Sequence, residues 1–155
     1  MVTTLGRRAP PGAPHATAVG LVQDILHAAF QGTAFHVRAQ QPIRIGDDSE
    51  PEPDVAVVKG RRLDYRDAHP AAADVVLAVE VADTSIDLDR RRKARLYARA
   101  GIPEYWIIAP PERILEVCTN PGPAGYERRA VLRPGDTAGP LARPEARIEV
   151  ASLLP

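Results

Sequence analysis

The sequence has few of the residues that define disulfide-rich and zinc-binding proteins. Its single cysteine, Cys118, excludes an intrachain disulfide and a cysteine-rich zinc module. The four histidines form no pair at metal-ligand spacing, so a zinc site is not expected. The sequence also lacks a P-loop, a GxGxxG motif and a GxSxG motif. Nucleotide-binding and α/β-hydrolase interpretations therefore have no support.

Net charge and long apolar runs are absent as well. The 20 basic residues balance the 20 acidic residues, so the formal net charge is zero. This balance excludes a binder that depends on bulk positive charge, although a local basic patch stays compatible. No window approaches the roughly 18 apolar residues of a membrane span, and residues 1–14 have no apolar run typical of a signal peptide. We expect a cytoplasmic protein without a membrane partner.

The chain length of 155 residues favours one domain. We expect a Pro- and Gly-containing lead-in over residues 1–14 and a single domain over residues 15–155. Apolar and β-branched runs predict strands separated by turn residues. The order of strands and helices favours an α/β fold with one mixed central sheet flanked by helices. The predicted strands cover residues 34–45, 53–58, 74–82, 103–109, 113–119, 125–132 and 146–150, and residues 59–73 and 133–147 are expected as loops.

Two helices are predicted from apolar spacing. In the first, over residues 15–31, His15 shares a stripe with the apolar residues, and Gly32 ends the helix. The second covers about residues 87–100 and ends at Gly101, a residue type that favours the left-handed conformation after a helix.

Two acids lie beside apolar runs that predict strands. Glu80 is flanked by valines, and Asp54 follows a proline and opens the run VAVV. A buried carboxylate is unfavourable unless it is paired or binds a cation. Each acid alone has a simpler explanation, since Glu80 can pair with an arginine and Pro-Asp is a common turn dipeptide. Together, two carboxylates at one sheet edge are typical of a magnesium or manganese site.

Helix geometry separates Lys93 from the arginines around it. At about 100° per residue, Lys93 shares a face with Asp89 and Tyr97. Most of the neighbouring arginines fall on other faces. Lys93 can therefore form a local pair with Asp89, or reach the two acids of the sheet. The spacing alone leaves both alternatives open.

These residues carry a resemblance that extends over most of the chain. The segments EPDVAVV (52–58) and VVLAVEVADTSIDLDRRRKARLYARAGIPEYWII (75–108) resemble the Uma-two family of restriction-endonuclease-like proteins, placed in the PD-(D/E)xK nuclease superfamily. The shared pattern is Pro-Asp, then Glu-Val and a serine, Asp-x-x-x-Lys, Tyr-Ala, and a closing Glu-Tyr-Trp. The family pattern also has an aspartate after Glu-Tyr-Trp, where this chain has Ala109, and a Glu-containing hairpin before the Pro-rich stretch.

The resemblance implies a restriction-endonuclease-like core and a metal-dependent nuclease. It implies that Asp54 and Glu80 hold Mg²⁺ or Mn²⁺, and we add the backbone carbonyl of Val81 as a ligand. The superfamily lysine usually stands two residues after the glutamate, where this chain has Ala82. The resemblance therefore implies that Lys93 takes that role from the helix.

The remaining expectations concern the surroundings of these residues. Lys93 would orient the attacking water and offset charge in the transition state. We expect Asp89, Tyr97 and His15 to hold the metal-binding groups and Lys93 in position without contacting the metal themselves. We expect a nucleic-acid partner, with DNA as the first candidate, and a homodimer is compatible with the family. Phosphate contacts are expected from four arginines of the second helix, Arg90, Arg91, Arg92 and Arg95.

Two other functions fit the same sequence. The first is a catalytically inactive nuclease fold that binds nucleic acid or protein. The second is a dimeric interaction protein that uses the strand of Tyr105 and Trp106 and the following hairpin, since aromatic residues are enriched at interfaces. Core packing is the simpler role for these aromatic residues.

Overall fold

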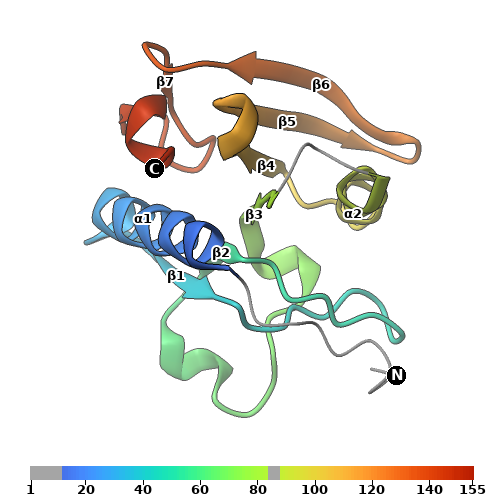
Figure 1. The fold of residues 1–155 in the computed structure, drawn as a ribbon. Helices are drawn as coiled ribbons and strands as arrows, with labels where there is room; N and C mark the ends of the chain where they lie inside the picture. The colour runs from blue at the N-terminus through green and yellow to red at the C-terminus, as the bar shows by residue number, and fades with distance from the viewer. Residues whose placement is uncertain (1–11, 84–87) are drawn as a thin grey trace.

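The computed structural model describes residues 12–83 and 88–155, without the side chains of residues 88 and 89. Six strands form one sheet in the order β1 to β6, and every neighbouring pair is antiparallel except the parallel pair β3–β4. The α/β fold with a mixed central sheet is thus confirmed (Figure 1). The strands are β1 (Phe35–Ala39), β2 (Val55–Lys59), β3 (Val75–Val81), β4 (Glu104–Ala109), β5 (Ile114–Gly122) and β6 (Gly125–Leu132).

Each face of the sheet carries one helix. Helix α1 (Ala13–Phe30) packs on one face together with the C-terminal segment, which contains β7 (Thr137–Ala138) and β8 (Ile148–Glu149). Helix α2 (Leu88–Arg99) lies on the opposite face, where Tyr97 belongs to a second apolar cluster (Figure 1). Because both faces are covered, β3 is apolar along almost its whole length.

The helix predictions agree with the structure to within a few residues. As the spacing predicts, His15 is buried on the same stripe of α1 as the apolar residues that face the sheet. Helix α2 ends at Arg99, and Gly101 follows two residues later with φ of +82°. The amide of Gly101 donates to the carbonyl of Ala98, and that of Ile102 to the carbonyl of Tyr97. These bonds satisfy carbonyls that the last turn leaves unpaired.

Some boundaries differ from the sequence analysis. Strand β1 ends at Ala39 because Gln40 adopts a left-handed conformation with φ of +52°, so residues 40–45 do not continue the strand. The expected loop over residues 59–73 contains a short 3-10 helix, Arg62–Tyr65, and a second one begins at its end. The expected loop over residues 133–147 includes β7, which pairs with β8.

Tyr105 and Trp106 have the simpler of the two roles considered for them, which is core packing. Both side chains are fully buried, and Trp106 donates its indole N–H to Glu104 inside the core. They cannot reach another molecule without unfolding the sheet. Among the described residues, no helix combines the length and the apolar character needed to cross a membrane.

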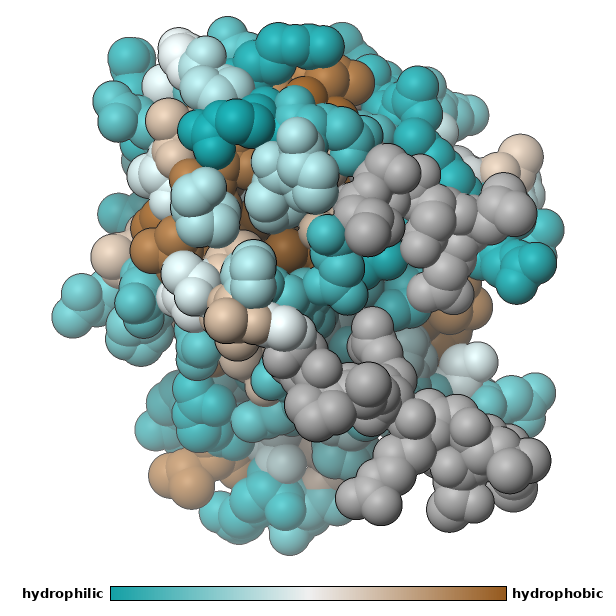
Figure 2. Space-filling model, viewed as in Figure 1, coloured by the Kyte–Doolittle hydropathy of each residue, from teal (hydrophilic) through white to brown (hydrophobic). Residues whose placement is uncertain are grey.

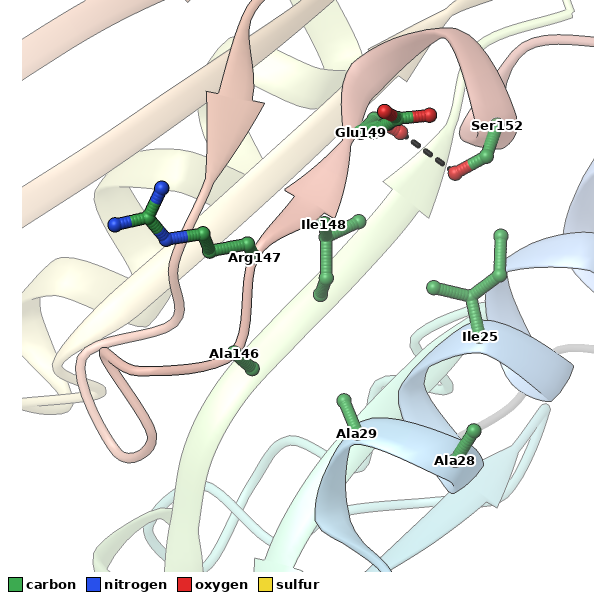
Figure 3. A pocket seen from close by; sticks show the side chains of 8 residues that line it. All are labelled: Ile25, Ala28, Ala29, Ala146, Arg147, Ile148, Glu149 and Ser152. Carbon is green, nitrogen blue, oxygen red and sulfur yellow. Dashed lines mark hydrogen bonds between the residues drawn. The ribbon is translucent and has the colours of Figure 1, made fainter.

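A shallow pocket of about 520 Å³ lies between the second half of α1 and the C-terminal segment (Figure 3). Its walls combine Ile25, Ala28 and Ala29 with residues 146–152. Figure 2 shows a largely hydrophilic face with hydrophobic atoms at this junction. Ile25 stands ten residues after His15 along α1, which corresponds to about 15 Å. This pocket is therefore separate from the acids described next.

Candidate active site

Asp54 and Glu80 lie side by side at one end of the sheet. Val55 pairs with Val79 in the antiparallel β2–β3 ladder, so the next position outward brings Asp54 opposite Glu80. Both carboxylates are buried, with exposed fractions of 6% for Asp54 and 2% for Glu80. The sheet register therefore brings together two acids that are 26 positions apart in the sequence.

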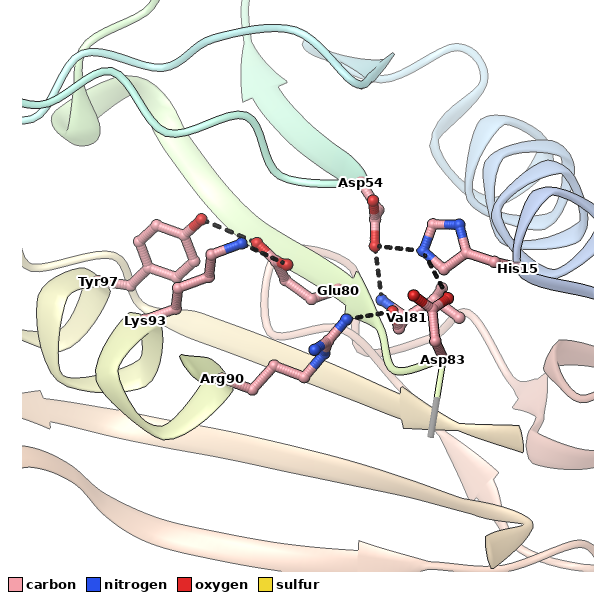
Figure 4. Close-up of polar contacts among 8 residues, drawn as sticks. All are labelled: His15, Asp54, Glu80, Val81, Asp83, Arg90, Lys93 and Tyr97. Carbon is pink, nitrogen blue, oxygen red and sulfur yellow. Dashed lines mark hydrogen bonds and ion pairs between the residues drawn. The ribbon is translucent and has the colours of Figure 1, made fainter. Parts of the chain in front are cut away.

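Helix α2 contributes two donors to Glu80 (Figure 4). Lys93 Nζ lies 3.0 Å from Oε1, and the Tyr97 hydroxyl donates to Oε2 over 3.1 Å. Lys93 and Tyr97 are four residues apart, so they share one face of the helix. Lys93 thus reaches the acid of the sheet, which is the second of the two alternatives that the spacing left open.

The protonation of this group depends on burial and on its neighbours. Burial raises the pKa of Glu80 above its ordinary value, Lys93 acts in the opposite direction, and the charge of Asp54 raises the pKa further. Burial, followed by the charge of Glu80, raises the pKa of Tyr97 far above the usual range. Tyr97 therefore stays a hydrogen-bond donor at neutral pH.

On the other side of the site, two groups contact Asp54. The amide of Val81 donates to Oδ2 over 2.8 Å, and Nε2 of His15 lies 3.3 Å from the same oxygen. The same Nε2 is 3.8 Å from Asp83 Oδ1 (Figure 4). The sequence analysis did not select Asp83. Its position directly after the β3 strand, three residues beyond Glu80, is the signal that could have identified it.

The arginines of α2 do not all fit the predicted phosphate contacts. Arg90 is 7% exposed and donates to the carbonyl of Val81 over 2.8 Å, so it supports the site from inside and is not available to a phosphate. Arg91 is half-buried and forms a two-point ion pair with Glu116 of β5. Arg92 and Arg95 are exposed. The side chain of Asp89 lies outside the described residues.

The donor set suits a hard divalent cation. Two adjacent carboxylates and a backbone carbonyl offer only oxygen ligands, and Mg²⁺ is commonly held by one or two carboxylates with water and substrate phosphate. The charge of Asp54 raises the pKa of Glu80, in addition to the larger effect of burial, and a cation between the two acids would offset this repulsion. Within residues 12–83 and 88–155, no group of three or more His, Cys, Asp or Glu is arranged to hold a metal.

A cleft adjoins the site at His15. It has a volume of about 400 Å³, and both His15 and Asp83 line it. Its other walls are mostly apolar, and Pro110 and Pro111 after β4 contribute to them. His15 and Asp83 are the ionisable side chains among its lining residues, and His15 is 3.3 Å from Asp54.

The comparisons with known proteins concern the family and the fold of the chain. A sequence model of the Uma2 family, described as "Putative restriction endonuclease", matches residues 4–151. A crystal structure of a putative nuclease belonging to DUF820 from Anabaena variabilis superposes with a TM-score of 0.74 at 15% identity, over 95% of this chain and 83% of that chain. A search of curated proteins gives no match. Since the family match extends over nearly the whole length, this chain belongs to the Uma2 family.

Proposed function

We propose that the protein is a metal-dependent nuclease that hydrolyses phosphodiester bonds of nucleic acid, with DNA as the first substrate to test. The observation that carries the proposal is the contact of Lys93 with Glu80 beside Asp54. This contact unites two acids and a lysine, the residue types that a phosphodiesterase of this kind needs, from three separate elements. The family description and the fold of the Anabaena protein support the same class of activity.

Asp54, Glu80 and the carbonyl of Val81 would hold Mg²⁺ or Mn²⁺. The bound cation would polarise a phosphoryl oxygen and lower the pKa of a water molecule. Lys93 would orient this water and balance negative charge on the phosphate, because its ammonium is partly exposed while its partner carboxylate is buried. Tyr97 fixes the Glu80 carboxylate through its hydroxyl, and Arg90 fixes the carbonyl of Val81.

One observation favours the inactive alternative. Protein donors already bind both oxygens of Glu80, and Arg90 already occupies one lone pair of the Val81 carbonyl. A scaffold that has lost its metal could be stabilised by the same internal bonds. The nuclease and the inactive scaffold therefore make opposite predictions for metal binding.

Calorimetric titration with Mn²⁺ separates these two functions without knowledge of the substrate. We expect binding by the wild type, and its loss in Asp54→Asn and in Glu80→Gln, with each variant checked for folding by circular dichroism. Glu145→Gln is the matched control, because it removes an exposed carboxylate from the C-terminal segment. Equal binding by all four proteins, or none up to millimolar Mn²⁺, would contradict the proposal.

Cleavage assays then test the reaction itself. Single- and double-stranded DNA and RNA are incubated with the protein in Mn²⁺ or Mg²⁺. Lys93→Ala should abolish cleavage, because the attacking water loses the group that orients it. It should retain Mn²⁺ binding, because the bound cation takes over the positive charge that Lys93 supplies to Glu80. A variant that still cleaves at the wild-type rate would exclude Lys93 from the reaction. Sedimentation velocity on the same samples tests whether the protein forms the homodimer that is compatible with the family.

A further inference from the structure

A row of arginines on α2 faces the β5–β6 hairpin. Arg91, Arg95 and Arg99 follow each other at intervals of four residues, so they lie about 6 Å apart along one side of the helix. Arg99 Nε donates to the carbonyl of Pro123 in the hairpin turn over 3.0 Å. The Cγ atom of Arg95 lies 3.7 Å from the position that a Cβ atom would occupy at Gly125, so Arg95 packs against the hairpin.

The hairpin adds a fourth arginine from the opposite side. Arg129 of β6 pairs with Cys118, whose side chain belongs to the apolar cluster beneath α2, so both point to the α2 face of the sheet. Arg129 lies 3.7 Å from Glu116 Oε1 and is 54% exposed. We name the surface formed by Arg91, Arg95, Arg99 and Arg129 the arginine groove.

The arginine groove concentrates positive charge in a chain with zero net charge. In the described part of the chain, the buried Glu116 is the acid that forms ion pairs with this surface, through Arg91 and Arg129. Two of the four guanidinium groups therefore share this one carboxylate. Among the described residues, no carboxylate forms an ion pair with Arg95 or Arg99, so internal pairing does not account for these two cations.

The groove begins beside the candidate active site. Glu80 pairs with Ile107 and Ile107 with Glu116 in one row across β3, β4 and β5. Two strand spacings separate Glu80 from Glu116, or about 10 Å. Arg91 therefore stands near the acids, and the row of arginines leads from there along α2 to the hairpin turn.

We propose that the arginine groove binds the phosphate backbone of the nucleic acid on one side of the candidate active site. This inference rests on the proposed nuclease function. Arg95, Arg99 and Arg129 would contact successive phosphates, and Arg91 would hold Glu116 in place between them. Such contacts position a strand without reading its sequence. The groove extends the predicted contacts to Arg99 and Arg129, which the sequence analysis did not select.

The test measures binding in EDTA, where cleavage cannot interfere. Fluorescence anisotropy follows a labelled DNA oligonucleotide, single- or double-stranded, over a series of salt concentrations. Arg95→Ala with Arg99→Ala should lower the slope of log K against log salt by about 2, and Arg129→Ala by about 1. The control Arg61→Ala with Arg66→Ala removes two exposed arginines away from the groove, whose side chains are 85% and 72% exposed. It should bind like the wild type.

Conservative replacement by lysine at positions 95 and 99 keeps the charge and should keep the slope, which separates lost charge from lost folding. Equal slopes in the groove and control variants, or no binding by the wild type, would overturn the inference. Failure of the nuclease function gives a different result. In that case neither the wild type nor Glu80→Gln cleaves DNA, while the groove variants still bind DNA more weakly than the wild type. If the wild type cleaves DNA and the groove variants bind DNA like the wild type, the inference about the groove is wrong and the nuclease function stands.

Discussion

Lys93 Nζ lies 3.0 Å from Glu80 Oε1, and this ion pair joins the partly exposed end of a helix side chain to a carboxylate buried in the sheet. Helix α2 follows β3 after a short connection and returns along the same face, so the cation and the acid meet although 13 positions separate them. Glu80 also contacts the neutral Tyr97, whereas Lys93 supplies the positive charge that lowers the pKa of Glu80 against the effect of burial.

Replacement of Lys93 by Met should destabilise the protein by about 3 kcal/mol at pH 7.5, because it leaves the buried carboxylate without its cation. The pKa of Glu80, already raised by burial, would rise further. Below that pKa the carboxyl group is neutral and needs no cation, so the deficit should shrink as the pH falls toward 5. Urea denaturation at both pH values measures this difference.

The double variant Lys93→Met with Glu80→Gln provides the control for this pair. It should recover part of the lost stability at pH 7.5, because no charge is left unpaired in the core. Tyr97→Phe, which removes a neutral donor, should lose only about 1–2 kcal/mol. A Lys93→Met deficit that is equal at both pH values would show that Glu80 is not the group that the lysine stabilises.

Glu104 makes a second buried network, in which both carboxylate oxygens accept from fixed donors. Trp106 Nε1 donates to Oε2 over 2.8 Å, and the amide of Leu141 donates to Oε1 over 2.9 Å. Glu104→Gln replaces one acceptor with an NH₂ group that faces a donor, so we expect a loss of about 1–3 kcal/mol in unfolding free energy. Urea denaturation measures it, with Glu145→Gln as an exposed control.

The pH dependence of Glu104→Gln has a defined sign. Burial raises the pKa of Glu104 above that of the unfolded chain. The wild type therefore loses stability relative to the glutamine variant as the pH rises from the ordinary carboxyl range through the raised pKa. The gap between the two proteins should be widest at acidic pH. A gap that widens toward neutral pH would contradict the raised pKa.

Local rules were sufficient for much of the site. The apolar flanks of Glu80 marked it as a buried acid, and the 100° spacing of α2 separated Lys93 from most of the arginines around it. The structure shows the contact of these two residues. Arg90 was expected to contact phosphate, but it points into the protein and donates to the carbonyl of Val81. It stands three residues before Lys93 on the same face, so its inward position could have been predicted from the helix geometry.

Other features depend on contacts between distant segments. Glu116 is exposed or buried according to which helix covers β5, and the sequence does not state that Arg91 lies over it. Glu104 needs the amide of Leu141, which comes from the C-terminal segment 37 residues later. Such acids look like ordinary charged residues until the sheet order brings their donors into place.

Gly101 is a position where backbone conformation alone decides stability. Its φ is +82°, and a side chain there would meet nothing within 4 Å. Gly101→Ala should therefore lose about 1–2 kcal/mol through the left-handed conformation and not through a clash. Gly20→Ala in α1, where a side chain also meets nothing, should instead gain about 0.5–1 kcal/mol. Thermal denaturation of the two variants should shift in opposite directions.

Cys118 should react slowly in the folded protein. Burial is the main cause that raises the pKa of its thiol from 9.0 to about 11. At pH 8 the reactive thiolate is then about a hundredfold scarcer than for an ordinary thiol, and the side chain is 3% exposed. Alkylation by iodoacetamide at pH 8, followed by mass spectrometry, should be at least about a hundredfold slower in buffer than in 6 M guanidinium, a concentration of about the level that unfolds even very stable domains.

The pH profile distinguishes the raised pKa from simple shielding. If the thiolate of the folded state reacts directly, the native rate should continue to rise by about tenfold per pH unit up to pH 10, beyond the point where an unfolded thiol levels off. If reaction requires opening of β5, the rate should instead follow the opening equilibrium and fall with added stabilising salt. Native alkylation as fast as that of the unfolded chain would contradict the burial of Cys118 between α2 and the sheet.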